Sequence, residues 1–181
     1  MNINIYGSTG FIGRKTLKLI DQNFPNLKVN LLCAKSNLKL LTKQIIQYKP
    51  KYAFLYDSEK IPNFDYQIGK TKFLNLNELH GYLKTSKSNL TLLAISGYKS
   101  LYFLESIIEN TDCLGLVSKE AIVSAGHIFR KRKYFNKTNI IPLDSEHFSL
   151  FELFKKINIR DNINKVTLTA SGGPFFKRKF S

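Results

Sequence analysis

Short apolar runs alternate along this chain with segments in which apolar and polar positions have a helical period. Short apolar runs of four to six residues have the length and composition of strands. Between them, apolar side chains recur every three or four positions, as in amphipathic helices. The predicted strands are residues 3–6, 29–33, 52–56, 90–95, 113–117 and 166–170. The predicted helices are residues 14–23, 38–48, 101–109, 119–129 and 148–157.

This alternation predicts an α/β fold with a parallel sheet and helices on both of its faces. The continuous apolar run 90–95 is typical of a strand that is buried on both sides. Residues 57–77 are more polar and less regular, and Ile140-Ile141 leads into a polar stretch. No internal repeat and no Gly/Ser-rich or Pro-rich linker divides the sequence.

The composition is that of a protein with a packed core. Of the 181 residues 43% are hydrophobic, including 14 Phe and 9 Tyr. No run of about 18 apolar residues occurs, so no membrane span is predicted. The first residues look like a strand rather than a signal peptide. Cys33 and Cys113 lie in apolar runs, which favours two free, buried thiols and a reducing, cytoplasmic setting.

The formal net charge is +15, from 28 Lys and Arg against 13 Asp and Glu. Such a charge attracts anionic ligands, either nucleic acid or phosphorylated small molecules. The lysines are scattered, and the two basic clusters, 130–133 and 177–179, lack the interleaved aromatic residues of a single-strand groove. We therefore expect no specific nucleic-acid partner.

A glycine loop, Gly7-Ser8-Thr9-Gly10-Phe11-Ile12-Gly13, stands between the first strand and the first helix. Glycines at this spacing permit a tight turn and let backbone N–H groups at a helix N-terminus approach a pyrophosphate. The hydroxyls of Ser8 and Thr9 would add donors. The alternative is a plain strand–helix turn without a ligand.

The end of the second strand reads Lys35-Ser36-Asn37 and contains no acidic residue. In dinucleotide-binding folds an acid at this place binds the ribose 2′-hydroxyl of NADH, whereas a cation suits the 2′-phosphate of NADPH. The sequence therefore predicts NADPH over NADH. The alternative is that Lys35 is one more solvated lysine.

The run Asp144-Ser145-Glu146-His147 places two carboxylates one residue apart. Their mutual repulsion is commonly offset by a divalent cation, here Mg²⁺ or Mn²⁺. The alternative is a helix start, with Asp144 as the N-cap and Glu146 in the first turn, and both roles are compatible. His147 is expected to pack or to support its neighbours rather than to bind metal.

Four blocks of this sequence resemble the 1-deoxy-D-xylulose 5-phosphate reductoisomerase family in order and spacing. They are the glycine loop, Ser118-Lys119-Glu120, Pro142-x-Asp144-Ser145-Glu146-His147 and Ser171-Gly172-Gly173-Pro174-Phe175. The resemblance implies a Rossmann-like NADPH-binding domain over residues 1–140 and the beginning of an α+β catalytic domain over residues 141–181. It also implies NADPH- and metal-dependent rearrangement and reduction of a phosphorylated sugar to 2-C-methyl-D-erythritol 4-phosphate, in isoprenoid biosynthesis.

The resemblance assigns roles to individual residues. Thr9, Gly10, Phe11 and Ile12 would lie on the NADPH pyrophosphate, with Lys35, Ser36 and Asn37 around the 2′-phosphate. Gly7 and Gly13 would complete the cofactor-binding loop. Ser118, Lys119 and Glu120 would lie near the nicotinamide half. Asp144 and Glu146 would be the catalytic metal ligands, and Ser145, Glu146 and Ser171 would bind substrate.

This chain also departs from the family pattern. The family usually has Ser at Phe11 and Asn at Ser118, and its members are about twice as long. The remaining part of those members carries a lid, further phosphate-binding residues, a third metal-binding Glu and a helical domain. We therefore expect a truncated or split form, and the family's usual homodimer is an expectation as well.

Two other functions remain open. One is a different NADP enzyme with the same opening loop, such as a semialdehyde dehydrogenase, but such an enzyme needs a catalytic cysteine in a loop and Cys113 lies inside a predicted strand. The other is a non-catalytic nucleotide-binding remnant, or one half of a split enzyme.

Overall fold

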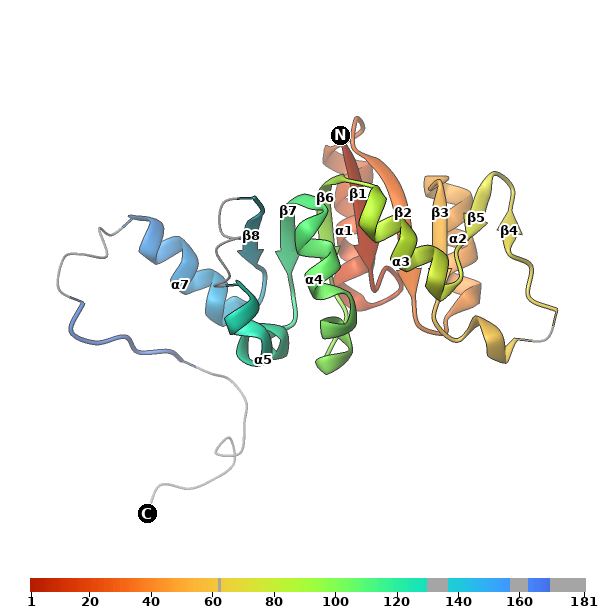
Figure 1. Cartoon of the computed structure of the whole chain (residues 1–181). Helices are drawn as coiled ribbons and strands as arrows, with labels where there is room; N and C mark the ends of the chain where they lie inside the picture. Colours follow the sequence, from red (N-terminus) through yellow and green to blue (C-terminus); the bar gives the residue numbers. More distant parts are fainter. Residues whose placement is uncertain (62, 130–136, 157–162, 170–181) are drawn as a thin grey trace, which may run out of the picture.

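The computed structural model describes residues 1–61, 63–129, 137–156 and 163–169. These residues form an eight-stranded sheet in the order β4-β5-β3-β2-β1-β6-β7-β8 (Figure 1). All neighbouring strands are parallel except the pair β4 and β5. The strands are β1 (Asn2–Tyr6), β2 (Lys28–Ala34), β3 (Tyr52–Leu55), β4 (Gln67–Ile68), β5 (Thr71–Phe73), β6 (Ser88–Leu93), β7 (Thr111–Leu116) and β8 (Asn139–Pro142).

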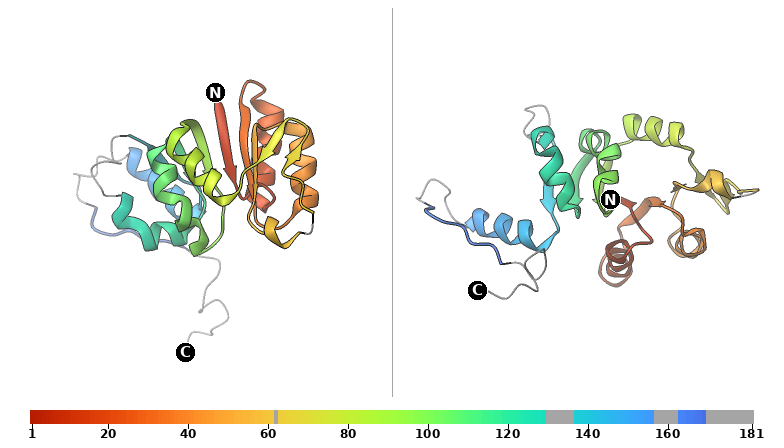
Figure 2. Two further views of the ribbon diagram at one scale, coloured as in Figure 1. Left: turned by 45° about the vertical axis from the view of Figure 1, so that its right-hand side comes forward. Right: turned by 90° about the horizontal axis from the view of Figure 1, so that it is seen from below.

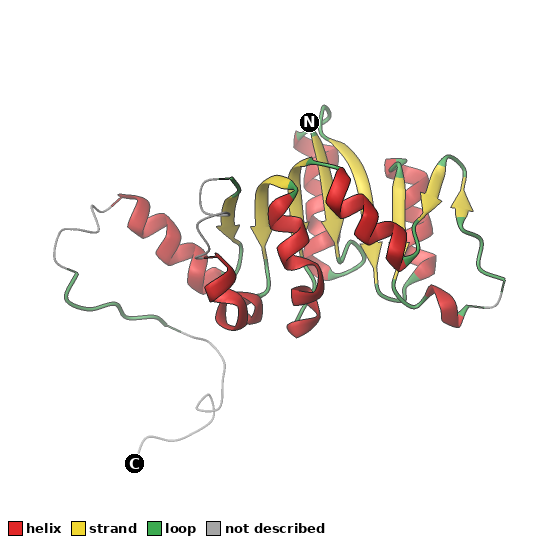
Figure 3. Cartoon of the chain, viewed as in Figure 1, coloured by secondary structure: helices red, strands yellow, loops and turns green. Residues whose placement is uncertain are grey.

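Helices cover both faces of this sheet (Figure 3). Helices α1 and α2 lie on one face, and α3, α4 and α5 lie on the other (Figure 2). The helices are α1 (Phe11–Asn23), α2 (Leu38–Tyr48), α3 (Leu76–Thr85), α4 (Leu101–Glu109), α5 (Lys119–Phe129) and α7 (Ser145–Lys156). Two short 3₁₀ turns, η1 (Ser58–Lys60) and η2 (Tyr98–Ser100), follow β3 and β6.

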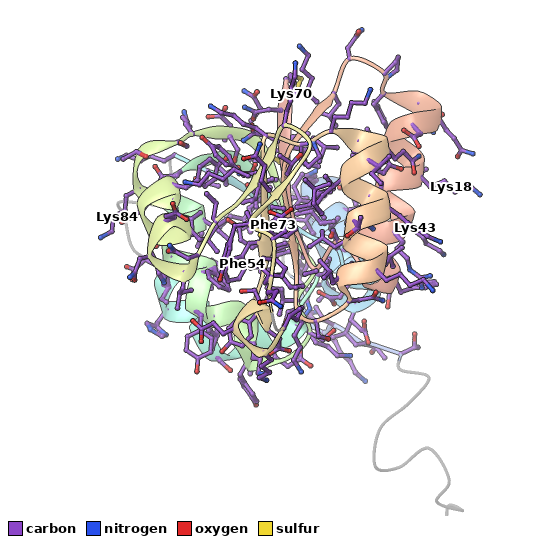
Figure 4. All side chains as sticks on the ribbon, turned by 90° about the vertical axis from the view of Figure 1, so that its right-hand side faces the viewer. Lys18, Lys43, Phe54, Lys70, Phe73 and Lys84 are labelled. Atoms are coloured by element: carbon purple, nitrogen blue, oxygen red, sulfur yellow. The ribbon has the colours of Figure 1, made fainter. Side chains whose placement is uncertain are left out.

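Each face of the sheet has its own hydrophobic core, because side chains alternate along every strand. On β1, Ile3 and Ile5 pack with α1 and α2, whereas Tyr6 packs with Phe54 and Phe103 on the other side. Figure 4 looks onto the edge of the molecule, with Phe54 and Phe73 among the packed side chains. Lys18, Lys43 and Lys84 point away from the helices into solvent, so these charges lie on solvated helix faces.

The strand order explains where a ligand would bind. The chain winds outward from β1 through β2 to β3, then returns to β6 on the other side of β1. Loops leaving the carboxyl ends of β1 and β6 therefore part in opposite directions and leave a crevice between them. The candidate site is at this crevice.

The predicted fold class, a Rossmann-like α/β domain with a parallel sheet, is confirmed. Helices α2, α4 and α5 have the predicted bounds. Helix α1 begins at Phe11, three residues before the predicted start, because Gly10 is its N-cap. Helix α7 begins at Ser145 rather than at residue 148, because Asp144 caps it as described below. Strand β8 belongs to the same sheet as β7, and the division at residue 140 stays a prediction.

Residues 57–85 contain elements that the sequence pattern does not predict. The hairpin of β4 and β5 is made of very short strands at the edge of the sheet. Helix α3 begins with a capping box, in which Asn75 and Glu78 bond each other's backbone N–H groups. Its Tyr82 hydroxyl accepts a hydrogen bond from Asn30 (2.6 Å) and donates one to Asn4 (3.2 Å), which ties α3 to the sheet.

The predicted strand at residues 166–170 is wrong for the residues that the structure describes. Residues 163–169 are exposed and belong to no strand. An apolar alternation forms a strand only where a neighbouring backbone supplies hydrogen-bond partners, and no described strand pairs with this segment. Residue 170 lies outside the described residues.

Both cysteines are free thiols, as predicted. Cys33 is buried and Cys113 is half-buried, and burial raises the pKa of each thiol. Among the residues described, no helix has the length and apolar character that crossing a bilayer requires.

Candidate cofactor and metal site

The glycine loop is held tightly against the ends of β2 and β6. The N–H groups of Gly7 and Ser8 both donate to the carbonyl oxygen of Cys33, at 2.9 Å. Gly7 has a φ of +86°, and a Cβ atom there would lie 2.4 Å from the carbonyl oxygen of Ala94. A Cβ atom on Gly13 would lie 2.3 Å from the carbonyl oxygen of Gly7. The first and third glycines are therefore required by the fold itself.

The loop opens into the N-terminus of α1. Gly10 is the N-cap and supplies no side-chain hydrogen bond. The N–H groups of the first helical turn have no partner within the helix, which makes this end suitable for a phosphate. The Phe11 ring is 61% exposed and lies under the Lys15 ammonium (4.4 Å from Nζ to the ring centroid), so it does not line the adjoining cavity.

Ser8 and Thr9 differ in position, contrary to the expectation that both hydroxyls serve a ligand. Thr9 lines the cavity. Ser8 is fully buried, and its hydroxyl has no partner within the described part of the chain. Its carbonyl oxygen accepts a hydrogen bond from Gln44 (2.9 Å). Ser8 therefore anchors the loop to α2 and is turned away from the cavity.

A cavity of about 350 Å³ opens at the carboxyl ends of β1, β2, β3 and β6. The predicted residues that line it are Gly7, Thr9, Gly10 and Lys35. Those that the sequence analysis missed are Tyr6, Cys33, Ala34, Phe54, Tyr56, Ala94, Ile95, Ser96, Lys99 and Phe103. Most of these belong to the last residues of a parallel strand or to the loop that follows it, and that position is the signal that could have identified them.

The predicted 2′-phosphate group, Lys35, Ser36 and Asn37, is exposed between β2 and α2. The side-chain oxygen of Asn37 accepts a hydrogen bond from the N–H of Leu40 (3.0 Å), so Asn37 also caps α2. Lys35 lines the cavity. Lys35 and the N-terminus of α2 thus lie next to each other beside this cavity.

The second cluster lies at the neighbouring strands β7 and β8. These strands are parallel, and the N–H of Leu143 donates to the carbonyl oxygen of Leu116 (2.7 Å). Their carboxyl ends therefore bring Ser118-Lys119-Glu120, at the start of α5, beside Asp144-Ser145-Glu146, at the start of α7. Nζ of Lys119 lies 3.3 Å from Oε1 of Glu146, and the Ser118 hydroxyl donates to Glu120 (2.9 Å).

Asp144 fulfils the predicted helix-capping role and keeps one oxygen open. Its Oδ1 accepts from the backbone N–H of His147 (2.9 Å) and lies 2.7 Å from Nδ1 of the same residue. Its Oδ2 is buried and has no hydrogen-bond partner among the residues that the structure describes. A buried carboxylate oxygen without a partner is costly, and a hard divalent cation would satisfy it. The donor set at Asp144 therefore fits the expected metal.

Glu146 is ionised, and both of its carboxylate oxygens already have partners. Its Oε2 accepts from the Ser145 hydroxyl (2.8 Å), and its Oε1 faces Lys119. The Ser145 hydrogen bond, the backbone N–H and Lys119 lower the pKa of Glu146 to about 2. No group of three or more His, Cys, Asp or Glu side chains with metal-binding geometry exists in the described part of the chain.

Two further predictions concern residues away from this cluster. Ser171, the predicted substrate ligand, lies outside the described residues. Cys113 lies within β7 and not in a loop at the carboxyl edge of the sheet. Its position therefore does not support the alternative of an enzyme with a catalytic cysteine.

Comparisons with known proteins agree with this geometry. The family model of 1-deoxy-D-xylulose 5-phosphate reductoisomerase matches residues 3–126, and the model of its C-terminal domain matches residues 140–181. Reductoisomerases from Wigglesworthia glossinidia brevipalpis (34% identical) and Pelagibacter ubique (36%) are matched over 96% of this chain. The chain spans 47% and 45% of their lengths, which is about half.

A solved structure has the same fold. The Zymomonas mobilis reductoisomerase in complex with NADPH superposes with a TM-score of 0.81 at 27% identity, over 98% of this chain and 47% of that one. Sequence blocks, sheet order, glycine loop and family models lead to the same assignment. The chain belongs to the 1-deoxy-D-xylulose 5-phosphate reductoisomerase family.

Proposed function

We propose that this chain binds NADPH in the cavity at the carboxyl ends of β1, β2, β3 and β6, as the cofactor-binding part of a 1-deoxy-D-xylulose 5-phosphate reductoisomerase. The observation that carries the proposal is the glycine loop, whose first and third glycines admit no side chain and whose helix N-terminus opens beside this cavity. A relative of the same fold, 27% identical, has been solved in complex with NADPH. In this proposal residues 1–140 form the nucleotide domain and residues 141–181 begin the catalytic domain.

The proposed nucleotide contacts follow the path of the cavity. Backbone N–H groups of Phe11, Ile12 and Gly13, with the Thr9 hydroxyl, would bind the pyrophosphate, whereas the Gly10 N–H already donates to the Gly7 carbonyl (3.0 Å). Lys35, Ser36 and Asn37 would bind the 2′-phosphate at the N-terminus of α2. Ser118, Lys119 and Glu120 would contact the nicotinamide half, because they leave β7, two strands from β1.

Asp144 and Glu146 would hold Mg²⁺ or Mn²⁺, with Ser145 placed to bind the phosphorylated sugar. The open Oδ2 of Asp144 supports this assignment, and the lowered pKa of Glu146 keeps its carboxylate charged at neutral pH. When bound, the cation would polarise the substrate carbonyl, and NADPH would supply hydride. Lys119 would then exchange its bond to Glu146 for a contact with cofactor or substrate.

A second candidate is a nucleotide-binding module that does not turn over substrate alone, or half of a split enzyme. One observation favours it. In the described residues, one of the two proposed metal carboxylates, Glu146, already pairs with Lys119. The two candidates share the NADPH site and differ in catalysis.

Titration of the purified chain with NADPH, with NADH as control, tests the common part of the two proposals. Tight binding that prefers NADPH supports the cofactor site, and no binding of either nucleotide would overturn it. Turnover of 1-deoxy-D-xylulose 5-phosphate with NADPH and Mn²⁺ then separates the two candidates. Nucleotide binding without turnover would favour the non-catalytic module.

A further inference from the structure

Lys99 belongs to the cavity but to none of the motifs in the sequence. It follows β6, in the 3₁₀ turn η2, and lines the cavity together with Lys35 and Tyr56. The turn is fixed from both sides, since Gly97 has a φ of +72° and the buried Ser100 donates its hydroxyl to the Gly97 carbonyl (2.8 Å). Lys99 is therefore carried by a defined turn.

The side chain of Lys99 reaches across the mouth of the cavity. Its Nζ lies 5.5 Å from the ring centroid of Tyr56, the residue after β3. Strands β1 and β2 lie between β6 and β3, and three strand spacings amount to about 14 Å. The turn and the lysine together thus bridge the carboxyl ends of the two central strands, above the place where an adenosine ribose would bind.

Three lysines, Lys35, Lys60 and Lys99, lie near the Asp57 carboxylate at this bridge, so these four groups carry a net charge of +2. Asp57 is ion-paired with Lys60 (2.8 Å) and its N–H donates to the carbonyl oxygen of Lys35 (2.8 Å). The hydrogen bond from Lys60 is the main cause of the lowered pKa of Asp57, with smaller effects from the charges of Lys35 and Lys99. Since Lys60 neutralises Asp57, Lys35 and Lys99 remain as two positive charges on the cavity wall.

We propose that Lys99 is a second specificity-determining cation for the 2′-phosphate of NADPH, opposite Lys35 and braced by the Tyr56 ring. A phosphate monoester carries a charge of about −1.5 to −2 at neutral pH, which two lysines match. The inference rests on the proposed NADPH site and adds the residue that would read the 2′-phosphate from the β6 side. It also accounts for the contact between Lys99 and Tyr56, which does not contribute to the hydrophobic core because both side chains are exposed.

The test uses the full chain and four nucleotides: NADPH, NADH, adenosine 2′,5′-bisphosphate and 5′-AMP. Lys99→Met keeps the apolar stem and removes the charge. It should weaken adenosine 2′,5′-bisphosphate and NADPH about tenfold and leave 5′-AMP and NADH unchanged. The matched control is Lys51→Met, because Lys51 makes the same kind of contact, 5.1 Å from the Tyr52 ring, at the opposite end of β3. This control should change none of the four affinities.

The outcomes separate this inference from the proposed function. If wild-type chain prefers NADPH and Lys99→Met keeps that preference, or weakens all four nucleotides by one factor, the assignment of Lys99 is wrong while the cofactor site stands. If wild-type chain binds none of the four, the proposed function fails and the inference fails with it. Circular dichroism of both variants checks that they are folded.

Discussion

Lys119 and Glu146 form an ion pair across two helix N-termini, with Nζ 3.3 Å from Oε1. Helices α5 and α7 follow the adjacent parallel strands β7 and β8, so the pair joins two sequence motifs that are 27 residues apart. In the proposed metal site, the ammonium occupies an oxygen that a divalent cation would otherwise bind. We therefore expect Lys119 to compete with the metal in the chain without nucleotide.

Replacing Lys119 with Met should consequently tighten Mn²⁺ binding to the nucleotide-free chain. An exposed ion pair is weak, so the gain in Mn²⁺ affinity should be about fivefold at most. Isothermal titration calorimetry with Mn²⁺ measures it directly. Lys155→Met is the matched control, because Lys155 pairs with Glu152 on the same helix (2.9 Å) and should leave Mn²⁺ affinity unchanged. Weaker binding in the Lys119 variant would contradict the competition.

The double variant Asp144→Asn, Glu146→Gln should abolish Mn²⁺ binding and leave NADPH binding intact. Both amides keep the shape of the carboxylates, and Asn caps a helix as well as Asp does, so α7 should stay folded. The cavity that would hold NADPH contains neither residue. Paramagnetic relaxation of water protons by Mn²⁺ and a parallel NADPH titration report the two sites separately. Unchanged metal affinity would remove these carboxylates from the metal site.

Gly13→Ala should destabilise the chain and weaken NADPH binding. A Cβ atom there meets the Gly7 carbonyl oxygen at 2.3 Å and the Ser8 Cα at 2.7 Å, and this backbone is held by the hydrogen bonds of Gly7 and Ser8 to Cys33. We expect a loss of about 1–3 kcal/mol in the free energy of unfolding, measured by urea denaturation. Gly81→Ala lies inside α3, where a new Cβ meets no described atom within 4 Å outside its chain neighbours and the helix's own backbone. It should instead stabilise the chain by about 0.5–1 kcal/mol. Equal effects of the two substitutions would show that the close approach at Gly13 is tolerated.

The sequence predicted those parts of the fold that depend on local pattern. Helix α2 has a regular apolar stripe and a capping Asn37, and its predicted bounds agree with the structure. The strands β4 and β5 have two and three residues, which is too short for a periodicity to be recognised. Their position at the edge of the sheet depends on tertiary contacts that no local pattern contains.

The same distinction holds for the site. The sequence locates the glycine loop and Lys35, because these belong to one strand–turn–helix unit. It does not locate Lys99 beside Tyr56, because their meeting depends on β6 lying on the far side of β1. It also assigns both Ser8 and Thr9 to the ligand, although the turn geometry buries one hydroxyl and presents the other side chain to the cavity.

The last prediction concerns the capping box of α3 and how its contribution to the free energy of unfolding depends on pH. Glu78 accepts hydrogen bonds from Lys72 (2.6 Å) and from the N–H of Asn75 (2.9 Å), and these lower its pKa below the ordinary 4.5, the Lys72 bond first. A carboxyl whose pKa is lower in the folded state stabilises the fold fully above its unfolded pKa. That contribution is lost as the pH falls through the folded pKa.

Glu78→Gln should therefore lower the free energy of unfolding by about 0.5–1 kcal/mol at neutral pH, and the difference from wild type should shrink as the pH is lowered below 4.5. Asn75→Ala removes an uncharged cap and should cost about 1 kcal/mol with much less dependence on pH. Urea denaturation of the three chains over this pH range measures both effects. If the Glu78→Gln difference persisted at the acid end, the stabilisation would come from packing or from an uncharged hydrogen bond, and not from the carboxylate.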